Sequence, residues 1–161
     1  MFPRTLFAVA ALLLASPALA DTPSPERFFD GETTGTGTLK VMMSKAKTLT
    51  DRGTGRTERD GTVVLDQIVE EPGAPTRKRQ WRLRQTAPGK IEGTLSDAKG
   101  PVIGEFANNV LHMRYTMKDG VKVEQWLRLS PDGQQGANRM VFKKFGMTVA
   151  TLEGSVRRKG R

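Results

Sequence analysis

The side chains best suited to catalysis in this chain are its single histidine and its serines. Alternation with apolar neighbours puts His112 on the outer face of a predicted strand, and the chain has no second histidine and no cysteine to share a metal with it. A serine nucleophile needs a base and an oxyanion hole, and no G-x-S-x-G motif is present. We therefore expect no enzyme activity, no metal site and no cofactor. One alternative stays open, an isomerase or hydrolase whose carboxylates meet only after folding.

Residues 31–40, GETTGTGTLK, have the composition of a phosphate-binding loop. A dinucleotide fingerprint requires G-x-G-x-x-G between a strand and a helix, and a P-loop requires Gly-Lys-Ser/Thr at the start of a helix. Here Lys40 stands in place of the third glycine, and the residues that follow continue as a strand-like run. We interpret the glycine-rich part as a flexible lead-in to the first strand.

Several small or polar residues lie where strand alternation predicts an apolar, inward-facing side. Arg79 is in register with Trp81, and Asp51 is in register with Leu49. The other such residues are glutamines and glycines: Gln67, Gln85, Gln125, Gly53 and Gly55. Glycines in place of bulky side chains would leave room inside the fold, so the pattern predicts a cavity.

The predicted cavity would hold a small amphipathic ligand, with polar groups orienting its head. The ligand-binding residues that we expect on these inward faces are Arg79, Trp81, Tyr115, Asp51, Gln67 and Gln125. Two alternatives remain for the charged pair: an internal salt bridge between Asp51 and Arg79, because buried charges usually pair, or a position at a wet barrel mouth.

Short alternating runs separated by turn dipeptides occupy nearly all of the chain after Phe28. The dipeptides are Asp60-Gly61, Pro88-Gly89, Asn108-Asn109, Asp119-Gly120 and Asp132-Gly133. Such dipeptides between alternating runs are typical of hairpins, because their residues tolerate positive φ. The pattern predicts an all-β, antiparallel up-and-down meander of about 8–10 strands, which protects its edges best by closing into a barrel. A two-sheet sandwich is the alternative.

The first residues have the pattern of a secretory signal peptide. Arg4 precedes an apolar run over residues 6–15, and Ala18-Leu19-Ala20 is a small-x-small cleavage site before Asp21. A membrane anchor is the alternative, although the run is shorter than the roughly 20 residues that a spanning helix needs. We expect a signal peptide over 1–20, a flexible leader over 21–27 and one barrel domain over 28–159. The protein would be periplasmic or secreted.

The chain is basic, with a net charge of +9. Cations gather on the predicted outer faces: Lys78, Arg82, Arg84, Arg114, Lys118, Lys122, Arg128, Lys143 and residues 157–161. An exported basic protein meets anionic lipid and acidic polymers rather than nucleic acid. A second hypothesis is therefore a non-catalytic envelope protein with a filled barrel that acts through this surface.

Four segments in collinear order resemble a bacterial envelope family known as a domain of unknown function, number 3833. They are RFFDGETTGTG (27–37), QWRLRQTAPGKIEGT (80–94), GEFANNVLHMRYTM (104–117) and NRMVFKKFGMTV (138–149). The resemblance implies a lipocalin-like, or calycin-like, barrel and adds no activity. Many members look like lipoproteins, whereas this chain has no cysteine to carry a lipid.

The resemblance also draws attention to two arginines. Arg114 and Arg139 match pattern residues of the family, and they would either pair structurally or face a ligand. We include both among the candidate ligand-binding residues. Gly146 also matches the pattern and is expected to make the last tight turn, beside Lys144 and Phe145.

Overall fold

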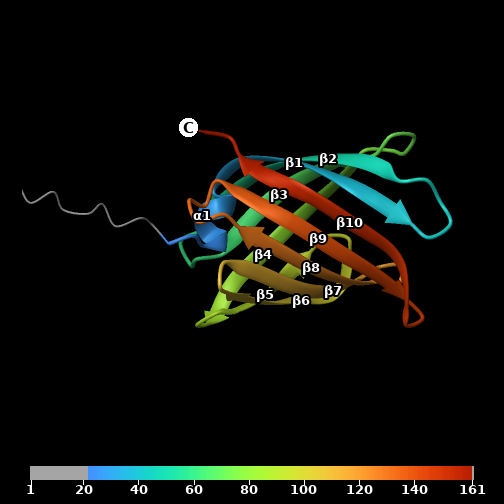
Figure 1. Ribbon diagram of the computed structural model, residues 1–161. Coiled ribbons are helices and arrows are strands. Elements are labelled where there is room, and N and C mark those ends of the chain that lie inside the picture. The colour runs from blue at the N-terminus through green and yellow to red at the C-terminus, as the bar shows by residue number, and fades with distance from the viewer. Residues whose placement is uncertain (1–21, 161) are drawn as a thin grey trace, which may run out of the picture.

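A closed antiparallel barrel makes up most of the protein, and the computed structural model describes residues 22–160. The strands are β1 Gly31–Val41, β2 Lys47–Thr57, β3 Val63–Glu70, β4 Arg77–Ala87, β5 Lys90–Leu95, β6 Ala98–Ala107, β7 Val110–Met117, β8 Lys122–Leu129, β9 Gln135–Lys144 and β10 Met147–Arg158. Each strand pairs with the next, and β1 pairs with β10 to close the sheet (Figure 1). The predicted up-and-down barrel is confirmed, and the sandwich is excluded. The predicted signal peptide lies outside the described residues.

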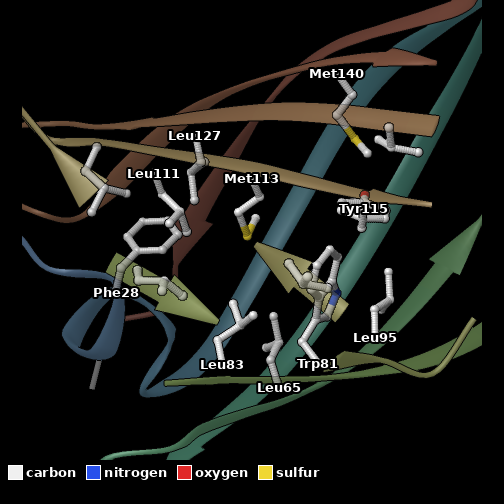
Figure 2. Close-up of a cluster of buried hydrophobic side chains, with 14 residues drawn as sticks. Phe28, Leu65, Trp81, Leu83, Leu95, Leu111, Met113, Tyr115, Leu127 and Met140 are labelled. Atoms are coloured by element: carbon white, nitrogen blue, oxygen red, sulfur yellow. The ribbon is translucent and has the colours of Figure 1, made fainter. Parts of the chain in front are cut away.

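Side-chain alternation along each strand separates the interior from the surface. In β7, Leu111, Met113 and Tyr115 are buried, whereas His112 and Arg114 face outward. Because successive side chains of a strand point to opposite faces, one apolar row per strand is enough to build the core. That core extends from Phe28 past Met113 to Trp81 and Tyr115 (Figure 2).

A short helix, α1 (Pro25–Phe29), closes one end of the barrel (Figure 1). Ser24 caps it by accepting a hydrogen bond from the Arg27 backbone N–H, and Pro25 occupies the first turn. The helix points Phe28 into the barrel, where its side chain is 1% exposed. The leader predicted over 21–27 therefore differs from the structure in its last three residues, which are helical because the cap and the buried phenylalanine hold them.

The glycine-rich segment at the start of the barrel is strand, not a lead-in. β1 begins at Gly31 and runs through Lys40 to Val41. Within it, Gly35 lies directly opposite Asp51 of β2, and a Cβ at position 35 would overlap the Asp51 carboxylate. The glycine there makes room for a charged side chain inside the barrel.

Gly53 and Gly55 of β2 do not leave the empty space that was predicted from glycines at inward-facing positions. A Cβ at Gly53 would crowd Leu65, and a Cβ at Gly55 would overlap the Phe29 carbonyl oxygen. Neither glycine lines the cavity described below. The sequence interpretation was wrong on this point, because neighbouring groups and the end of α1 fill the thin part of the strand.

The opposite end of the barrel is its mouth, where β1, β3, β5, β7 and β9 end and the next strands begin. The turn between β9 and β10 is formed by Phe145 and Gly146 at φ of 51° and 77°, which confirms the tight turn expected at Gly146. Within residues 22–160, no helix is long and apolar enough to cross a membrane.

Candidate functional site

A cavity of about 340 Å³ lies inside the barrel and reaches the mouth. This volume is in the lower part of the range of about 300–1,000 Å³ that is usual for small-molecule sites. Apolar side chains make up most of its wall, among them Leu49, Leu65, Val69, Leu83, Met113, Met117, Leu127, Met140, Phe142 and Leu152. At the mouth its wall includes Val41, Glu71, Arg77 and Val121. The cavity is therefore apolar in depth and charged near its opening.

Two hydrogen-bonded chains cross the interior beside this apolar wall. In the first, Trp81 Nε1 donates to Gln67 Oε1 over 3.0 Å, and Gln67 Nε2 donates to Asp51 Oδ2 over 2.7 Å. The indole therefore faces one end of an amide whose other end is bound to a carboxylate. Each member of this chain has its polar group satisfied, which holds the side chains in one arrangement.

The second chain starts at Tyr115, whose ring packs edge-on against Trp81 with centroids 5.3 Å apart. The Tyr115 hydroxyl donates to Gln125 Oε1 over 3.3 Å, and Gln125 Nε2 donates to Asn138 Oδ1 over 3.0 Å. Burial raises the pKa of Tyr115 to about 12, so its hydroxyl is a neutral donor at physiological pH. The two hydrogen-bonded chains meet at the edge-on contact between the Trp81 and Tyr115 rings.

Arg79 is the exception to this pattern of satisfied groups. Its side chain is 9% exposed and lines the cavity, and its guanidinium lies over the Trp81 ring, 5.1 Å from the centroid. Nε lies 3.5 Å from Asp97 Oδ1, an ion-pair distance without hydrogen-bond geometry. Among the buried side-chain polar atoms of residues 22–160, only Arg79 Nε and Nη2 and Asp97 Oδ1 lack a hydrogen bond. A buried cation with unused donors is energetically unfavourable, and an acceptor inside the cavity would satisfy them.

Asp51 does not form the internal salt bridge with Arg79 that was one alternative. Its carboxylate accepts from Gln67, and the carboxylate near Arg79 belongs to Asp97, in the turn between β5 and β6. Burial raises the pKa of Asp51, while the Gln67 hydrogen bond and the charge of Arg79 act in the opposite direction. The cavity wall therefore carries an acid that burial makes harder to ionise.

The difference in Tm between Asp51→Asn and the parent should change in favour of the variant as pH rises from acid to neutral. Because the pKa of Asp51 is raised on folding, its favourable contribution is complete below the unfolded value near 3.8 and is lost as pH rises through the folded value. Asparagine does not ionise and can still accept from Gln67. Thermal unfolding of both proteins at a series of pH values measures the difference in Tm. A difference that shrinks as pH rises contradicts this account.

Six of the eight sequence-predicted site residues line the cavity, and two do not. The six are Arg79, Trp81, Tyr115, Asp51, Gln67 and Gln125. Arg114 points outward and lies 3.9 Å from Glu105. Arg139 also points outward, 3.8 Å from Glu153. Both arginines occupy strand positions whose side chains face solvent, so neither contacts a ligand inside the barrel. Gln85, expected on the inward face, is exposed near a β-bulge at the end of β4.

The role of Arg139 is visible on the outer surface. Its guanidinium lies over the Trp126 ring, 5.7 Å from the centroid, and Trp126 stacks on His112 at 4.9 Å. His112 Nε2 is 2.8 Å from Glu124 Oε1. These residues are cross-strand neighbours on β7, β8 and β9. The lone histidine therefore belongs to a surface ladder, and no group of three or more metal-ligating side chains is found in the described part of the chain.

Sequence reasoning did not single out Asp97 or Asn138 as site residues. Asp97 lies in a turn, where a carboxylate has no inward-facing periodicity to mark it. It reaches Arg79 because β5 pairs with the preceding strand, β4, in a hairpin. Asn138 does fall in register with Met140 on the inward face of β9. The same alternation that identified Gln125 would have found it.

The family model described as "Protein of unknown function (DUF3833)" matches residues 16–158. No curated protein matches the sequence significantly. Among solved structures, the S-type phycobiliprotein lyase CPES from Guillardia theta is similar at TM-score 0.66 and 8% identity, over 84% of this chain and 91% of that chain. Rv2717c from M. tuberculosis is similar at TM-score 0.65 and 14% identity, over 86% and 99%. At these identities the likeness shows the lipocalin-like barrel fold alone.

Proposed function

The chain belongs to the DUF3833 family of proteins of unknown function, and on that premise we propose that it is a binding protein that holds one small amphipathic molecule in its barrel. The observation that carries the proposal is Arg79, a buried cation with two unused donor atoms at the wall of a 340 Å³ cavity. A bound acceptor would satisfy those donors, and the apolar wall would bury the rest of the molecule.

An anionic head group fits Arg79 better than a neutral one. Guanidinium groups bind carboxylate or phosphate oxygens through two N–H donors at once, and hydrogen bonds between charged partners are the stronger ones. The Trp81 ring holds the guanidinium from one side. Asp97, the nearest carboxylate, leaves Nε and Nη2 without hydrogen bonds. The proposed ligand is therefore a molecule such as a fatty acid, with an acidic head and an apolar body.

We also propose that the protein is exported from the cytoplasm. The pattern of residues 1–20 supports export to the periplasm or beyond, with cleavage between Ala20 and Asp21. Fractionation of cells that express the full chain, followed by N-terminal sequencing, tests this part. A mature protein that begins at Asp21 in the periplasm or medium is the expected result, and an uncleaved protein in the cytoplasm would reject it.

The first test of ligand binding is native mass spectrometry of the exported protein, purified without detergent. We expect an adduct of a few hundred daltons that organic extraction removes, since about 340 Å³ holds a single small molecule. Identification of the extract then names the ligand class. A clean apo mass that stays unchanged after incubation with envelope lipids and with dodecanoate would count against the proposal.

A narrowed cavity should lose the ligand. Ala150 lines the cavity and its neighbour Thr151 does not, so Ala150→Phe is the test variant and Thr151→Phe its matched control. Both variants are best made in a Trp126→Phe background, because the chain has two tryptophans and this change leaves Trp81 as the only indole reporter. We expect dodecanoate to change Trp81 fluorescence in the control. In Ala150→Phe, the Kd for dodecanoate from the same titration should be at least about tenfold higher. Equal titration curves would place the ligand elsewhere.

A further inference from the structure

Exposed apolar side chains gather at one corner of the barrel mouth. Among the described residues, the exposed large hydrophobic side chains are Val41, Met42, Met43, Phe145, Met147 and, away from this corner, Ile103. Met43 is 100% exposed and Phe145 is 89% exposed. Scattered surface apolar residues are ordinary, but a cluster of them on adjacent loops marks a contact site.

The two loops that carry these side chains lie side by side. Val41 of β1 pairs with Ala150 of β10, and the Met42 backbone N–H donates to the Val149 carbonyl oxygen over 2.9 Å. Met147 begins β10 directly after the Phe145 turn. Both loops lie at the end of the barrel opposite α1 (Figure 1). Residues 41–43 and 145–147 therefore form one apolar rim, named here the mouth rim.

Turn stability does not explain the apolar residues at the tips of the mouth rim. Met43 and Phe145 have φ of 62° and 51°, a region that favours glycine and asparagine. The β6–β7 turn at the opposite end uses Asn108 and Asn109 at φ of 51° and 60°. The rim thus places bulky apolar side chains in an unfavourable backbone conformation and exposes them to solvent, which points to a role outside the fold.

Lysines without acidic partners surround the mouth rim. They are Lys40, Lys45, Lys122, Lys143 and Lys144, and none of the ion pairs between described residues includes any of them. Lys122 and Lys143 lie directly opposite each other on β8 and β9, an arrangement of like charges that is unfavourable on its own. Lys144 Nζ lies 5.9 Å from the centre of the Phe145 ring. An anionic surface would supply the negative charges with which these lysines could pair.

We propose that the mouth rim docks on an anionic phospholipid bilayer, with Met42, Met43 and Phe145 inserted among the lipids and the lysines on phosphate groups. Apolar tips flanked by cations are the combination that holds a protein at a membrane interface. A second copy of the chain is a poorer partner, because its rim would oppose lysine with lysine. Docking does not depend on the proposed cavity ligand, although it would bring the cavity opening to the headgroup layer.

The test is cosedimentation of the purified chain with vesicles of phosphatidylcholine and phosphatidylglycerol, compared with phosphatidylcholine alone. Met43→Asn combined with Phe145→Asn is the rim variant, and it should keep its Tm because asparagine suits both backbone positions. We expect it to bind the anionic vesicles at least about tenfold more weakly than the parent. Ile103→Asn is the control, since Ile103 is exposed elsewhere, and it should bind like the parent.

Charge and location are tested separately. Lys122→Gln with Lys143→Gln should weaken binding roughly tenfold, while Arg128→Gln, at the closed end of the barrel, should leave it unchanged. Because the chain has no cysteine, Met43→Cys and Ile103→Cys each accept one environment-sensitive dye. Only the dye at position 43 should shift to the blue on anionic vesicles. The proposal is overturned if the parent does not bind these vesicles, if the rim and control variants bind equally, or if the rim instead mediates self-association without lipid.

Discussion

Phe28→Ala should lower the free energy of unfolding by about 3–5 kcal/mol, the usual range for removing a buried aromatic ring. Phe28 is 1% exposed, closes the end of the barrel, and packs edge-on against Phe29 at 5.0 Å. Its ring fills the space beside Gly136, where an added Cβ would lie 3.4 Å from Phe28 Cζ, an ordinary van der Waals contact. Barrel strands do not move readily into such a space, so the cavity would remain. Equilibrium denaturation in urea measures the change.

The matched control for this prediction is Phe145→Ala, because Phe145 is the same residue type at 89% exposure. Its effect should stay within about 0.5 kcal/mol. Similar losses in the two variants would mean that α1 does not close the barrel in solution. The same comparison matters for ligand binding, since a barrel open at the α1 end would let water into the apolar part of the cavity.

Arg79→Met should weaken dodecanoate binding by roughly 10–150-fold, which corresponds to the loss of about 1.5–3 kcal/mol for hydrogen bonds to a charged group. Methionine keeps much of the length of the side chain and removes the charge. Dodecanol, which has the same apolar body and no charge, should bind the parent and the variant within a few-fold of each other. Titration of Trp81 fluorescence in the Trp126→Phe background measures both ligands.

The control for Arg79 lies on the same strand. Arg84→Met removes an arginine from the outer face, where it lies 3.7 Å from Asp60, and dodecanoate binding should not change. The Arg79→Met protein should be somewhat less stable than the parent, because Asp97, whose Oδ1 is buried, loses its ion-pair partner. If dodecanoate and dodecanol lose affinity equally, Arg79 shapes the cavity and does not bind an anionic head.

The fold was largely predictable from the sequence because a strand records its two faces in a period of two. The β7 run shows this directly, since Leu111, Met113 and Tyr115 alternate with His112 and Arg114 in the sequence and in the barrel. Turn dipeptides such as Asp132-Gly133 mark where the chain reverses. The same alternation identified Arg79, Asp51, Gln67 and Gln125 as polar residues on inward faces, because polarity at an apolar position is a local signal.

For the residues that matched the family pattern, the match was less informative than the face of the strand on which each residue lies. Arg114 and Arg139 were selected through a resemblance to family patterns, and strand alternation alone would have placed both on the outside. There they pair with Glu105 and Glu153. A pattern position identifies a residue that the fold uses, but the direction of its side chain decides whether it reaches a cavity.

Which inward polar groups find hydrogen-bond partners could be seen only in the folded structure. Asp97 lies 18 positions after Arg79 in a turn, and Phe29 fills the space beside Gly55 from a helix that the alternation did not predict. Closure of β1 on β10 also gathers residues 41–43 and 145–147 into one rim. The strands, their faces and the up-and-down order of the barrel could be predicted from the sequence, because they depend on local periodicity and on turns between consecutive strands. The partner of Arg79 depends on the register of the β4–β5 hairpin, and the filling of the glycine positions depends on side chains and backbone from neighbouring strands and α1. Local periodicity records neither.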